Sequence, residues 1–252
     1  MAQPADDFIR FEHVHRSFGP QKVLDDVSLR VRRGRTRAIL GLSGSGKSVM
    51  MKHAIGLLRP DAGRIVVDGD DVGKLGPEAL LHMRRKFGMV FQQSALFDSM
   101  TVAQNVAFPL EEHSRMSREG KANAVREKLS LVGLANMGHK YPAELSGGMR
   151  KRVALARAIV LEPACVLYDE PTTGLDPLTT DTVDHMILDA QKALKVTSVV
   201  ISHDIGSAMK VADDIAVIDG GRIVADCPAT ELAHSAHPFV QKFLASWYGK
   251  QR

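Results

Sequence analysis

Residues 41–48 read Gly-Leu-Ser-Gly-Ser-Gly-Lys-Ser, and this stretch decides the fold class. It matches the pattern G-x-x-x-x-G-K-[ST], in which glycines let the backbone curl until several N–H groups point at one anion. We expect the Lys47 ammonium to reach the β- and γ-phosphates of a nucleoside triphosphate, and the Ser48 hydroxyl to ligate Mg²⁺. The residues expected to surround the phosphates are Gly41, Ser43, Gly44, Ser45, Gly46, Lys47, Ser48 and Val49.

The segments on either side of this loop support the same interpretation. Residues 37–40 predict a short buried strand, and residues 49–55 predict the helix that follows the loop. The phosphates would therefore lie at a helix N-terminus, where free N–H groups and the helix dipole favour negative charge. The alternative, a glycine- and serine-rich loop with an incidental lysine, does not explain this order of strand, loop and helix.

The rest of the chain alternates between strand-like and helix-like patterns. A helical pattern runs from about residue 94 to 162, with strand-like segments before it and strands alternating with helices after it. This alternation predicts an α/β fold with a parallel sheet and right-handed crossovers. We expect strands at 8–14, 27–31, 65–67, 165–168 and 197–201, a hairpin at 215–224, and helices at 102–107, 118–132, 148–160, 178–194 and 230–247.

The composition excludes some classes of protein. No apolar run approaches the ~20 residues needed to span a bilayer, and the first residues lack the order of a signal peptide. Cys165 and Cys227 match no metal-site spacing, so we expect a reduced, cytosolic compartment. The net charge of +4 is compatible with a membrane surface or nucleic acid, but a solvated surface explains it equally well.

A pair of acids follows the apolar strand predicted at residues 165–168. Ligands of open α/β sheets bind outside the carboxyl ends of the strands, which is where Asp169 and Glu170 stand. We expect Asp169 to hold Mg²⁺ and Glu170 to polarise a water molecule for in-line attack on the γ-phosphate. Other adjacent acid pairs in the chain lack the preceding apolar strand, and we interpret them as solvated turns.

A second glycine-containing helix start lies at residues 145–149, Leu-Ser-Gly-Gly-Met. Ser146 is a suitable N-cap, and the glycines expose backbone N–H groups that suit a second phosphate contact. The alternative is an ordinary capped helix start, in which residues 150–152 form an exposed basic turn. His203, which follows the strand predicted at 197–201, is either structural or close enough to reach a γ-phosphate oxygen.

The order of these motifs identifies a family resemblance. The loop at 41–48, then Gln92, the motif at 145–148, the acids after the strand at 165–168, residues 174–176 and residues 202–204 together resemble the ATP-binding-cassette (ABC) ATPases over nearly the whole chain. The resemblance implies one α/β domain over 8–247, with a P-loop NTPase core and a mixed, mainly parallel sheet. It also implies an N-terminal antiparallel β subdomain, a helical subdomain inserted at about 94–162, and a tail at 248–252.

The resemblance also implies roles for individual residues. Phe18 would stack on adenine. Gln92 would be a ligand of Mg²⁺ and would also take part in catalysis. His203 would take part in catalysis. The signature residues Ser146, Gly147 and Gly148 would contact ATP bound to a second subunit, with Asp176 at the same interface. Two cassettes would thus enclose two molecules of ATP with Mg²⁺ as a homodimer, and nucleotide binding and hydrolysis would close and reopen it.

A subfamily is indicated by Met149, which replaces the common glutamine of the signature. Together with residues 91–97 and 105–113, it resembles the Mla/Mce-type cassettes, which energise trafficking of phospholipids or other hydrophobic substrates across the bacterial envelope. The implied partners are an integral-membrane permease and an Mce-domain substrate-binding protein. The implied location is peripheral, on the cytoplasmic face of the inner membrane.

Two alternatives remain to be separated from this hypothesis. One is the cassette of an amino-acid or other small-solute importer. The other, a cassette of DNA repair or translation, is disfavoured because the chain has one cassette and only a short helical insertion, so we expect no nucleic-acid partner. In the C-terminal segment after Ala229, we expect four aromatic residues to pack either on the chain's own core or across a neighbouring subunit: Phe239, Phe243, Trp247 and Tyr248.

Overall fold

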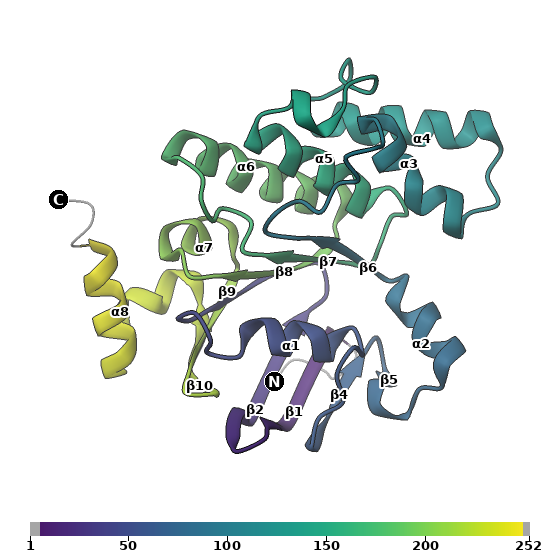
Figure 1. Cartoon of the computed structure of the whole chain (residues 1–252). Coiled ribbons are helices and arrows are strands. Elements are labelled where there is room, and N and C mark those ends of the chain that lie inside the picture. Colours follow the sequence, from purple (N-terminus) through teal and green to yellow (C-terminus); the bar gives the residue numbers. More distant parts are fainter. Residues whose placement is uncertain (1–5, 249–252) are drawn as a thin grey trace.

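The computed structural model describes residues 6–248, which form two sheets and a layer of helices (Figure 1). The first sheet is antiparallel, with the strand order β2-β1-β4-β5. The second has the order β10-β9-β3-β8-β7-β6 and is parallel except for β10. The strands are β1 Asp7–Phe18, β2 Gln21–Arg32, β3 Thr36–Leu40, β4 Ala62–Val67, β5 Asp70–Asp71, β6 Phe87–Val90, β7 Cys165–Asp169, β8 Thr197–Ser202, β9 Asp214–Asp219 and β10 Arg222–Pro228.

Helices cover both faces of the second sheet. In Figure 1, α1 lies between the two sheets, while α3 to α6 lie on the opposite side of the parallel sheet. The α-helices are α1 Lys47–Ala54, α2 Pro77–Arg84, α3 Val102–His113, α4 Arg118–Leu131, α5 Gly147–Ile159, α6 Pro177–Leu194, α7 Ile205–Val211 and α8 Pro238–Tyr248. Short 3₁₀ turns are η2 Val72–Lys74, η3 Pro142–Glu144 and η4 Ala229–His234.

Burial explains this layering. Every residue of β3 and β8 is buried, as expected for parallel strands with both faces covered. Met50 and Met51 of α1 join one apolar cluster with Phe8 of the first sheet and Leu167 of the second. The first sheet is therefore fixed to the core through the helix that follows the glycine-rich loop.

The predicted α/β class, with an antiparallel N-terminal sheet and an inserted helical segment, is confirmed. The interval 94–162 contains α3, α4 and α5, which pack in one apolar cluster against β7. Within this interval, α3 runs beyond the predicted end at residue 107 because Pro109 is accommodated inside the helix. None of the helices in residues 6–248 has the length and apolar character required to cross a bilayer.

The continuous helix predicted at 230–247 is wrong. A 3₁₀ turn occupies Ala229–His234, and α8 begins only at Pro238. Proline disfavours the helical conformation in the residue before it and lacks the N–H that a helix interior needs, so it starts a helix instead. The side chain of Tyr248 and the predicted tail beyond it, residues 249–252, lie outside what the structure describes.

Candidate nucleotide-binding site

The glycine-rich loop connects the carboxyl end of β3 to the N-terminus of α1. Gly44 and Gly46 have φ of +79° and +107°, in the left-handed region that favours glycine. A Cβ atom on Gly46 would also lie 2.8 Å from the carbonyl oxygen of Val23, on β2. The loop conformation therefore requires glycine at this position for both its backbone torsion and its packing.

Lys47 is held at the centre of this loop. Its ammonium is buried and donates hydrogen bonds to the carbonyl oxygens of Gly41 (2.8 Å) and Leu42 (3.0 Å). It also lies 3.7 Å from Oε1 of Glu170. Burial lowers the pKa of Lys47, and the negative charges of Glu170 and Asp169 oppose this shift. A phosphate bound in the loop would supply a further negative partner to this desolvated cation.

Glu170 stands immediately after β7 and is oriented by two neighbours. Its backbone has φ of +51°, and its amide donates to the carbonyl oxygen of Ile201 on β8 at 2.9 Å. Its Oε2 accepts a hydrogen bond from the Thr173 hydroxyl at 3.0 Å and lies 2.8 Å from Nδ1 of His203. Because the carboxylate is fixed at the carboxyl ends of β7 and β8, it faces the glycine-rich loop across the edge of the sheet.

These residues line one pocket with a volume of about 650 Å³, within the range of small-molecule sites. The sequence-predicted residues that it brings together are Ser43, Gly44, Gly46, Lys47, Ser48, Val49, Gln92, Asp169, Glu170 and His203. The remaining lining residues are Val23, Leu42, Thr173, Ile205, Phe243, Ser246 and Trp247. Gly41 and Ser45 belong to the same loop, although they do not line the pocket.

The donor set of the pocket fits a nucleotide with Mg²⁺. Ser48, Gln92 and Asp169 offer hydroxyl, amide and carboxylate oxygens, the hard ligands that Mg²⁺ prefers. Burial, followed by the charge of Glu170, raises the pKa of Asp169, so a cation beside it would relieve an unfavourable charge. No group of three His, Cys, Asp or Glu side chains within residues 6–248 could hold a metal, so phosphate oxygens and water would complete the coordination.

The signature residues stand outside this pocket. Ser146 is the exposed N-cap of α5, where its hydroxyl accepts from the amide of Met149 at 3.2 Å. Asp176 is the exposed N-cap of α6, and hydrogen bonds from Thr179 lower the pKa of its carboxyl. Within the described chain, neither residue lines the pocket, and the same is true of Gly147 and Gly148.

Phe18 also stands outside the pocket. It lies at the end of β1 with 43% of its surface exposed, and the Arg16 guanidinium lies 4.7 Å from the centre of its ring. Its predicted contact with adenine therefore stays a prediction. By contrast, Val23, Phe243 and Trp247 line the pocket, although sequence reasoning did not assign them to it. For Phe243 and Trp247, the aromatic content of the C-terminal segment was a weak indication in the sequence.

The position of Lys151 contradicts one alternative considered from the sequence, an exposed basic turn at residues 150–152. Residues 150–152 would form an exposed basic turn in that alternative, but Lys151 is buried with only 5% of its surface exposed. Its ammonium donates to the backbone carbonyl oxygens of Gln92 (3.2 Å) and Pro171. Burial lowers the pKa of Lys151. One side chain of α5 therefore ties together the segments that follow β6 and β7, both of which contribute to the pocket.

Comparisons with known proteins identify the family. A family model described as ABC transporter matches residues 24–173. The chain is 38% identical to the intermembrane phospholipid transport system ATP-binding protein MlaF of Escherichia coli K12, over 97% of this chain and 91% of MlaF. The chain belongs to the ABC transporter ATP-binding family. The observed fold is that of an ABC ATPase domain.

Other members of the ABC family are similarly close. The probable ribonucleotide transport ATP-binding protein mkl of Mycobacterium tuberculosis H37Rv is 42% identical over 91% of this chain. This chain spans 64% of the length of mkl. The methionine import ATP-binding protein MetN of Caulobacter vibrioides is 41% identical over 94% of this chain and 72% of MetN. A dimeric post-hydrolysis structure of the ATP-binding cassette MJ0796 bound to ADP and Pi, 30% identical, matches with a TM-score of 0.78 over 88% of this chain and 98% of that one.

Proposed function

We propose that this ABC cassette binds ATP with Mg²⁺ and hydrolyses the γ-phosphate bond. The observation that carries the proposal is the geometry of Glu170, whose carboxylate is fixed by Thr173 and His203 and faces the loop that holds Lys47. A carboxylate so placed can accept a proton from a water molecule that attacks the γ-phosphate in line. Bound Mg²⁺ would neutralise charge on the phosphates, with Ser48, Gln92 and Asp169 as the residues that hold it.

The site is completed, in this proposal, by a second copy of the chain. Ser146, Gly147 and Gly148 present a capped helix N-terminus outside the pocket, which is a suitable contact for a phosphate that another subunit binds. Asp176 would lie at the same interface. The dimeric arrangement of MJ0796 with ADP and Pi supports a two-fold assembly of this kind. His203 would contact the γ-phosphate, and Phe18 would contact adenine.

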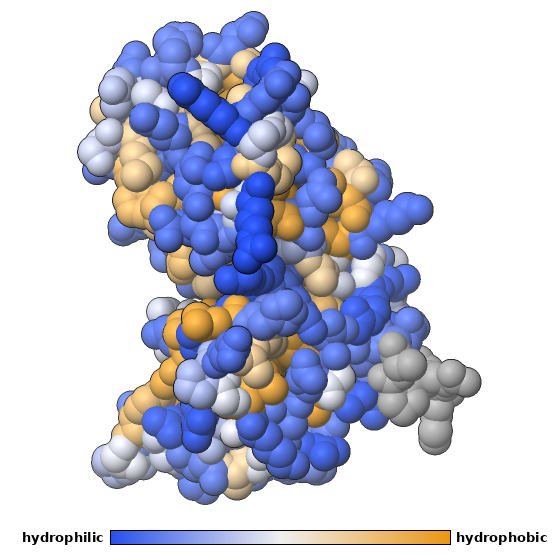
Figure 2. Space-filling model, turned by 90° about the vertical axis from the view of Figure 1, so that its right-hand side faces the viewer, coloured by the Kyte–Doolittle hydropathy of each residue, from blue (hydrophilic) through white to orange (hydrophobic). Residues whose placement is uncertain are grey.

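A membrane permease would dock in a groove beside Gln92. The groove has a volume of about 580 Å³ and lies between α2, β6 and α3. Its lining includes Leu81, Phe91 and Phe97, all of which expose 40% or more of their surface. Figure 2 shows apolar surface on both sides of the waist between the upper and lower lobes of this face. Because Gln92 follows Phe91 directly, a partner seated here could affect the Mg²⁺ site.

The transported substrate is proposed to be a phospholipid or another hydrophobic molecule of the bacterial envelope. The similarity to MlaF, which extends over nearly the full length of both chains, supports this choice. The cassette would then work peripherally on the cytoplasmic face of the inner membrane, with a permease and an Mce-domain substrate-binding protein. The second candidate is a small-solute importer, which the 41% identity to a methionine import cassette supports.

The Glu170→Gln variant tests the catalytic part of the proposal. The amide keeps the size of the side chain but cannot accept the proton, so steady-state ATP hydrolysis should fall by about 10²- to 10⁴-fold while ATP binding persists. Size-exclusion chromatography with MgATP should then show an accumulated dimer. The control is Glu78→Gln, an exposed acid on α2 away from the pocket. Full turnover in Glu170→Gln would exclude the general-base role.

Reconstitution separates the two transport hypotheses. The chain would be co-expressed with a candidate permease and placed in proteoliposomes with MgATP. ATP-dependent movement of a fluorescent phospholipid to acceptor vesicles would support the lipid hypothesis. Uptake of a radiolabelled amino acid without lipid movement would refute it and support the importer.

A further inference from the structure

A run of arginines lies at the end of the core opposite the nucleotide pocket. Residues 30–37 read Arg-Val-Arg-Arg-Gly-Arg-Thr-Arg, with five arginines in eight positions. The run leaves β2, turns, and enters β3 at its amino end, whereas the glycine-rich loop leaves β3 at its carboxyl end. The two ends of β3 thus belong to two separate surfaces of the molecule.

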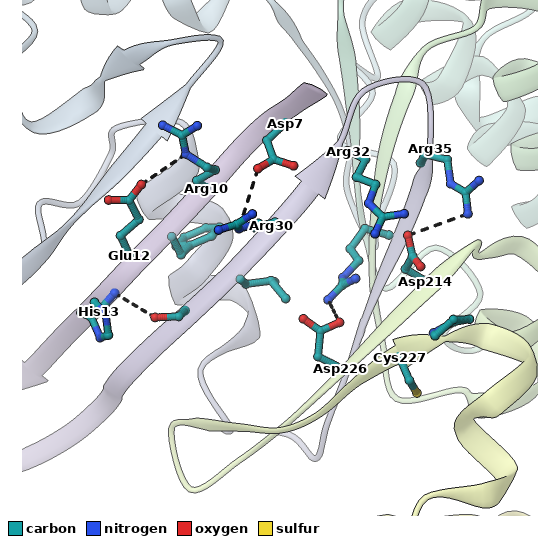
Figure 3. A pocket seen from close by; sticks show the side chains of 15 residues that line it. Asp7, Arg10, Glu12, His13, Arg30, Arg32, Arg35, Asp214, Asp226 and Cys227 are labelled. Atoms are coloured by element: carbon teal, nitrogen blue, oxygen red, sulfur yellow. Dashed lines mark hydrogen bonds and ion pairs between the residues drawn. The ribbon is translucent and has the colours of Figure 1, made fainter. Parts of the chain in front are cut away.

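Four of these arginines line one cavity. The cavity has a volume of about 710 Å³ and lies between the first sheet and the β9–β10 hairpin (Figure 3). Arg30, Arg32, Arg35 and Arg37 line it together with Arg10 of β1. Arg33 does not line it, because its guanidinium pairs with Asp68 and lies 5.2 Å from the centre of the Phe8 ring. The cavity therefore collects most, but not all, of a basic run.

Three of the lining guanidinium groups make no hydrogen bond within the described chain. Arg32 has no ion pair among the described residues either, and Figure 3 shows its side chain at the cavity without a marked partner. Arg30 lies 3.9 Å from Asp7, and Arg35 lies 3.6 Å from Asp213 and 4.0 Å from Asp214, which are too long for hydrogen bonds. Each guanidinium carries five N–H donors, so the cavity presents many unused donors at one place.

A buried arginine strengthens the case for a ligand. The side chain of Arg37 is only 8% exposed, and its terminal nitrogen pairs with Asp226 across the cavity. Its Nε is buried without a hydrogen-bond partner among the described residues. A buried unsatisfied donor on a cation is costly, so Arg37 adds a desolvated, incompletely paired positive charge to the lining of the cavity.

The lining restricts the kind of anion that fits. Four carboxylates, those of Asp7, Glu12, Asp214 and Asp226, stand among the arginines and would repel a long polyanion such as a nucleic-acid strand. The single phenylalanine of the lining, Phe11, is only 4% exposed, so among the lining residues only the imidazole of His13 could stack on a nucleotide base. A compact anion avoids both problems.

We propose that this cavity is a binding site for a small anion that carries two or more phosphate groups. The guanidinium fork matches phosphate oxygens in pairs, and three adjacent forks suit more than one phosphate. The volume is within the range of small-molecule sites. The site is separate from the nucleotide pocket and does not depend on the proposed ATP hydrolysis.

Calorimetry with inorganic pyrophosphate tests the site in the full-length chain. Lys47→Ala serves as the parent, because it removes the main phosphate contact of the nucleotide pocket. Adding Arg32→Gln and Arg35→Gln should weaken pyrophosphate binding by about tenfold or more, since two charge-assisted contacts are lost. The matched control adds Arg115→Gln and Arg118→Gln, which remove the same charge at exposed positions elsewhere and should leave the affinity unchanged. Equal affinity in the three chains would overturn the proposal.

Two further measurements make the result independent of these variants. Cys227 lines the cavity, so saturating pyrophosphate should slow its alkylation, while the buried Cys165 stays unreactive. Unchanged alkylation at saturating pyrophosphate would overturn the proposal. Sedimentation with phosphatidylglycerol vesicles tests a lipid source of phosphate. Vesicle binding that needs Arg32 and Arg35, without pyrophosphate binding, would assign the arginines to a membrane surface and refute a site for a small anion.

Discussion

The nucleotide pocket and the signature face, which consists of Ser146, Gly147 and Gly148, are both built on a helix N-terminus, but only the first of the two helix N-termini lines a pocket with other parts of the described chain. Both are helix N-termini with glycines at the start of the helix: Gly46 is the N-cap of α1, and Gly147 and Gly148 are the first residues of α5. Around α1, the chain adds an ammonium, two carboxylates and an imidazole to the N-terminus. The N-terminus of α5 stands outside that pocket, and no residue of α5 lines it.

From this difference we infer that a helix N-terminus suited to phosphate needs side chains from other strands and helices before it can take part in catalysis. The carboxylate of Glu170 reaches the pocket because β7 lies next to β8, which in turn lies next to β3, and its orientation comes from Thr173 and from His203 at the end of β8. Within residues 6–248, the signature residues Ser146, Gly147 and Gly148 do not line the pocket. We therefore expect it to function only against the pocket of a second copy, and the following predictions break or sharpen that expectation.

The largest expected effect is complementation between two inactive chains. Lys47→Ala removes the phosphate contact of the pocket, and Gly148→Asp places a negative charge on the signature face. Each homodimer should lose at least about 100-fold in ATP hydrolysis. A mixed dimer keeps one intact site, so an equal mixture should recover about a quarter of the wild-type rate if pairing is random.

A coupled-enzyme ATPase assay across mixing ratios would measure this recovery. The control mixture combines Lys47→Ala with Glu170→Gln. Both changes affect the pocket, so both sites of the mixed dimer keep a wild-type signature but neither site keeps an intact pocket. Recovery in the control, or none in the test mixture, would contradict a site shared between two copies.

A smaller effect is expected from replacing Lys151, which connects the signature helix α5 to two segments beside the nucleotide pocket. Lys151 of α5 bonds the carbonyl oxygens of Gln92 and Pro171, so Lys151→Met keeps the length of the side chain but removes both bonds. We expect a fall in the maximal rate of about tenfold with a smaller change in ATP affinity, because the loops lose their position relative to the phosphates. Lys192→Met, at an exposed position on α6, is the control. Equal kinetics in both variants would show that the link is only structural.

Trp247 offers a readout of the pocket alone. It is the one tryptophan of the sequence and lines the pocket on α8. MgATP should therefore change its fluorescence emission, and Trp247→Phe should alter ATP affinity by no more than about threefold because an aromatic ring is retained. Lys47→Ala should abolish the emission change. Binding detected by equilibrium dialysis without any change in emission would place the bound nucleotide away from α8.

The smallest expected effect is on stability and concerns the helix behind the pocket. His53 of α1 is fully buried, and burial lowers its pKa from the ordinary value of 6.5. A folded state that binds the proton less readily than the unfolded state loses stability as pH falls below that value. Urea titrations should show the unfolding free energy falling by on the order of 1 kcal/mol between pH 7 and 5. The His53→Gln variant should show a flatter dependence, and an equal slope would exclude this source.

Local sequence was enough to predict the parts of the site that are built from neighbouring residues. The loop at 41–48 depends on glycine torsions and on one lysine, and its strand and helix are encoded next to it. Asp169 and Glu170 could be placed at a strand end because the four residues before them are apolar. The antiparallel N-terminal sheet and the helical insertion followed from the order of motifs in a known family.

Other features were not predictable, because they depend on contacts between distant parts of the chain. The proline that starts α8 was visible, but its consequence for Phe243 and Trp247 depends on how that helix packs beside α7. Lys151 looked like a surface residue because lysine is seldom buried without partners, and those partners are backbone carbonyls after β6 and β7. The arginines of residues 30–37 form a cavity only because β1, β2 and the β9–β10 hairpin meet around them.

The sequence by itself therefore predicted the family from the order of its motifs, and it predicted the glycine-rich loop at 41–48 and the acid pair at the end of β7 from short-range backbone geometry and residue type. The tertiary structure decided which helix closes the pocket, which lysine joins its loops and which signature face is left outside it. The physical reason is that burial and hydrogen-bond partners are properties of packed surfaces, and these surfaces are assembled from segments far apart in the sequence.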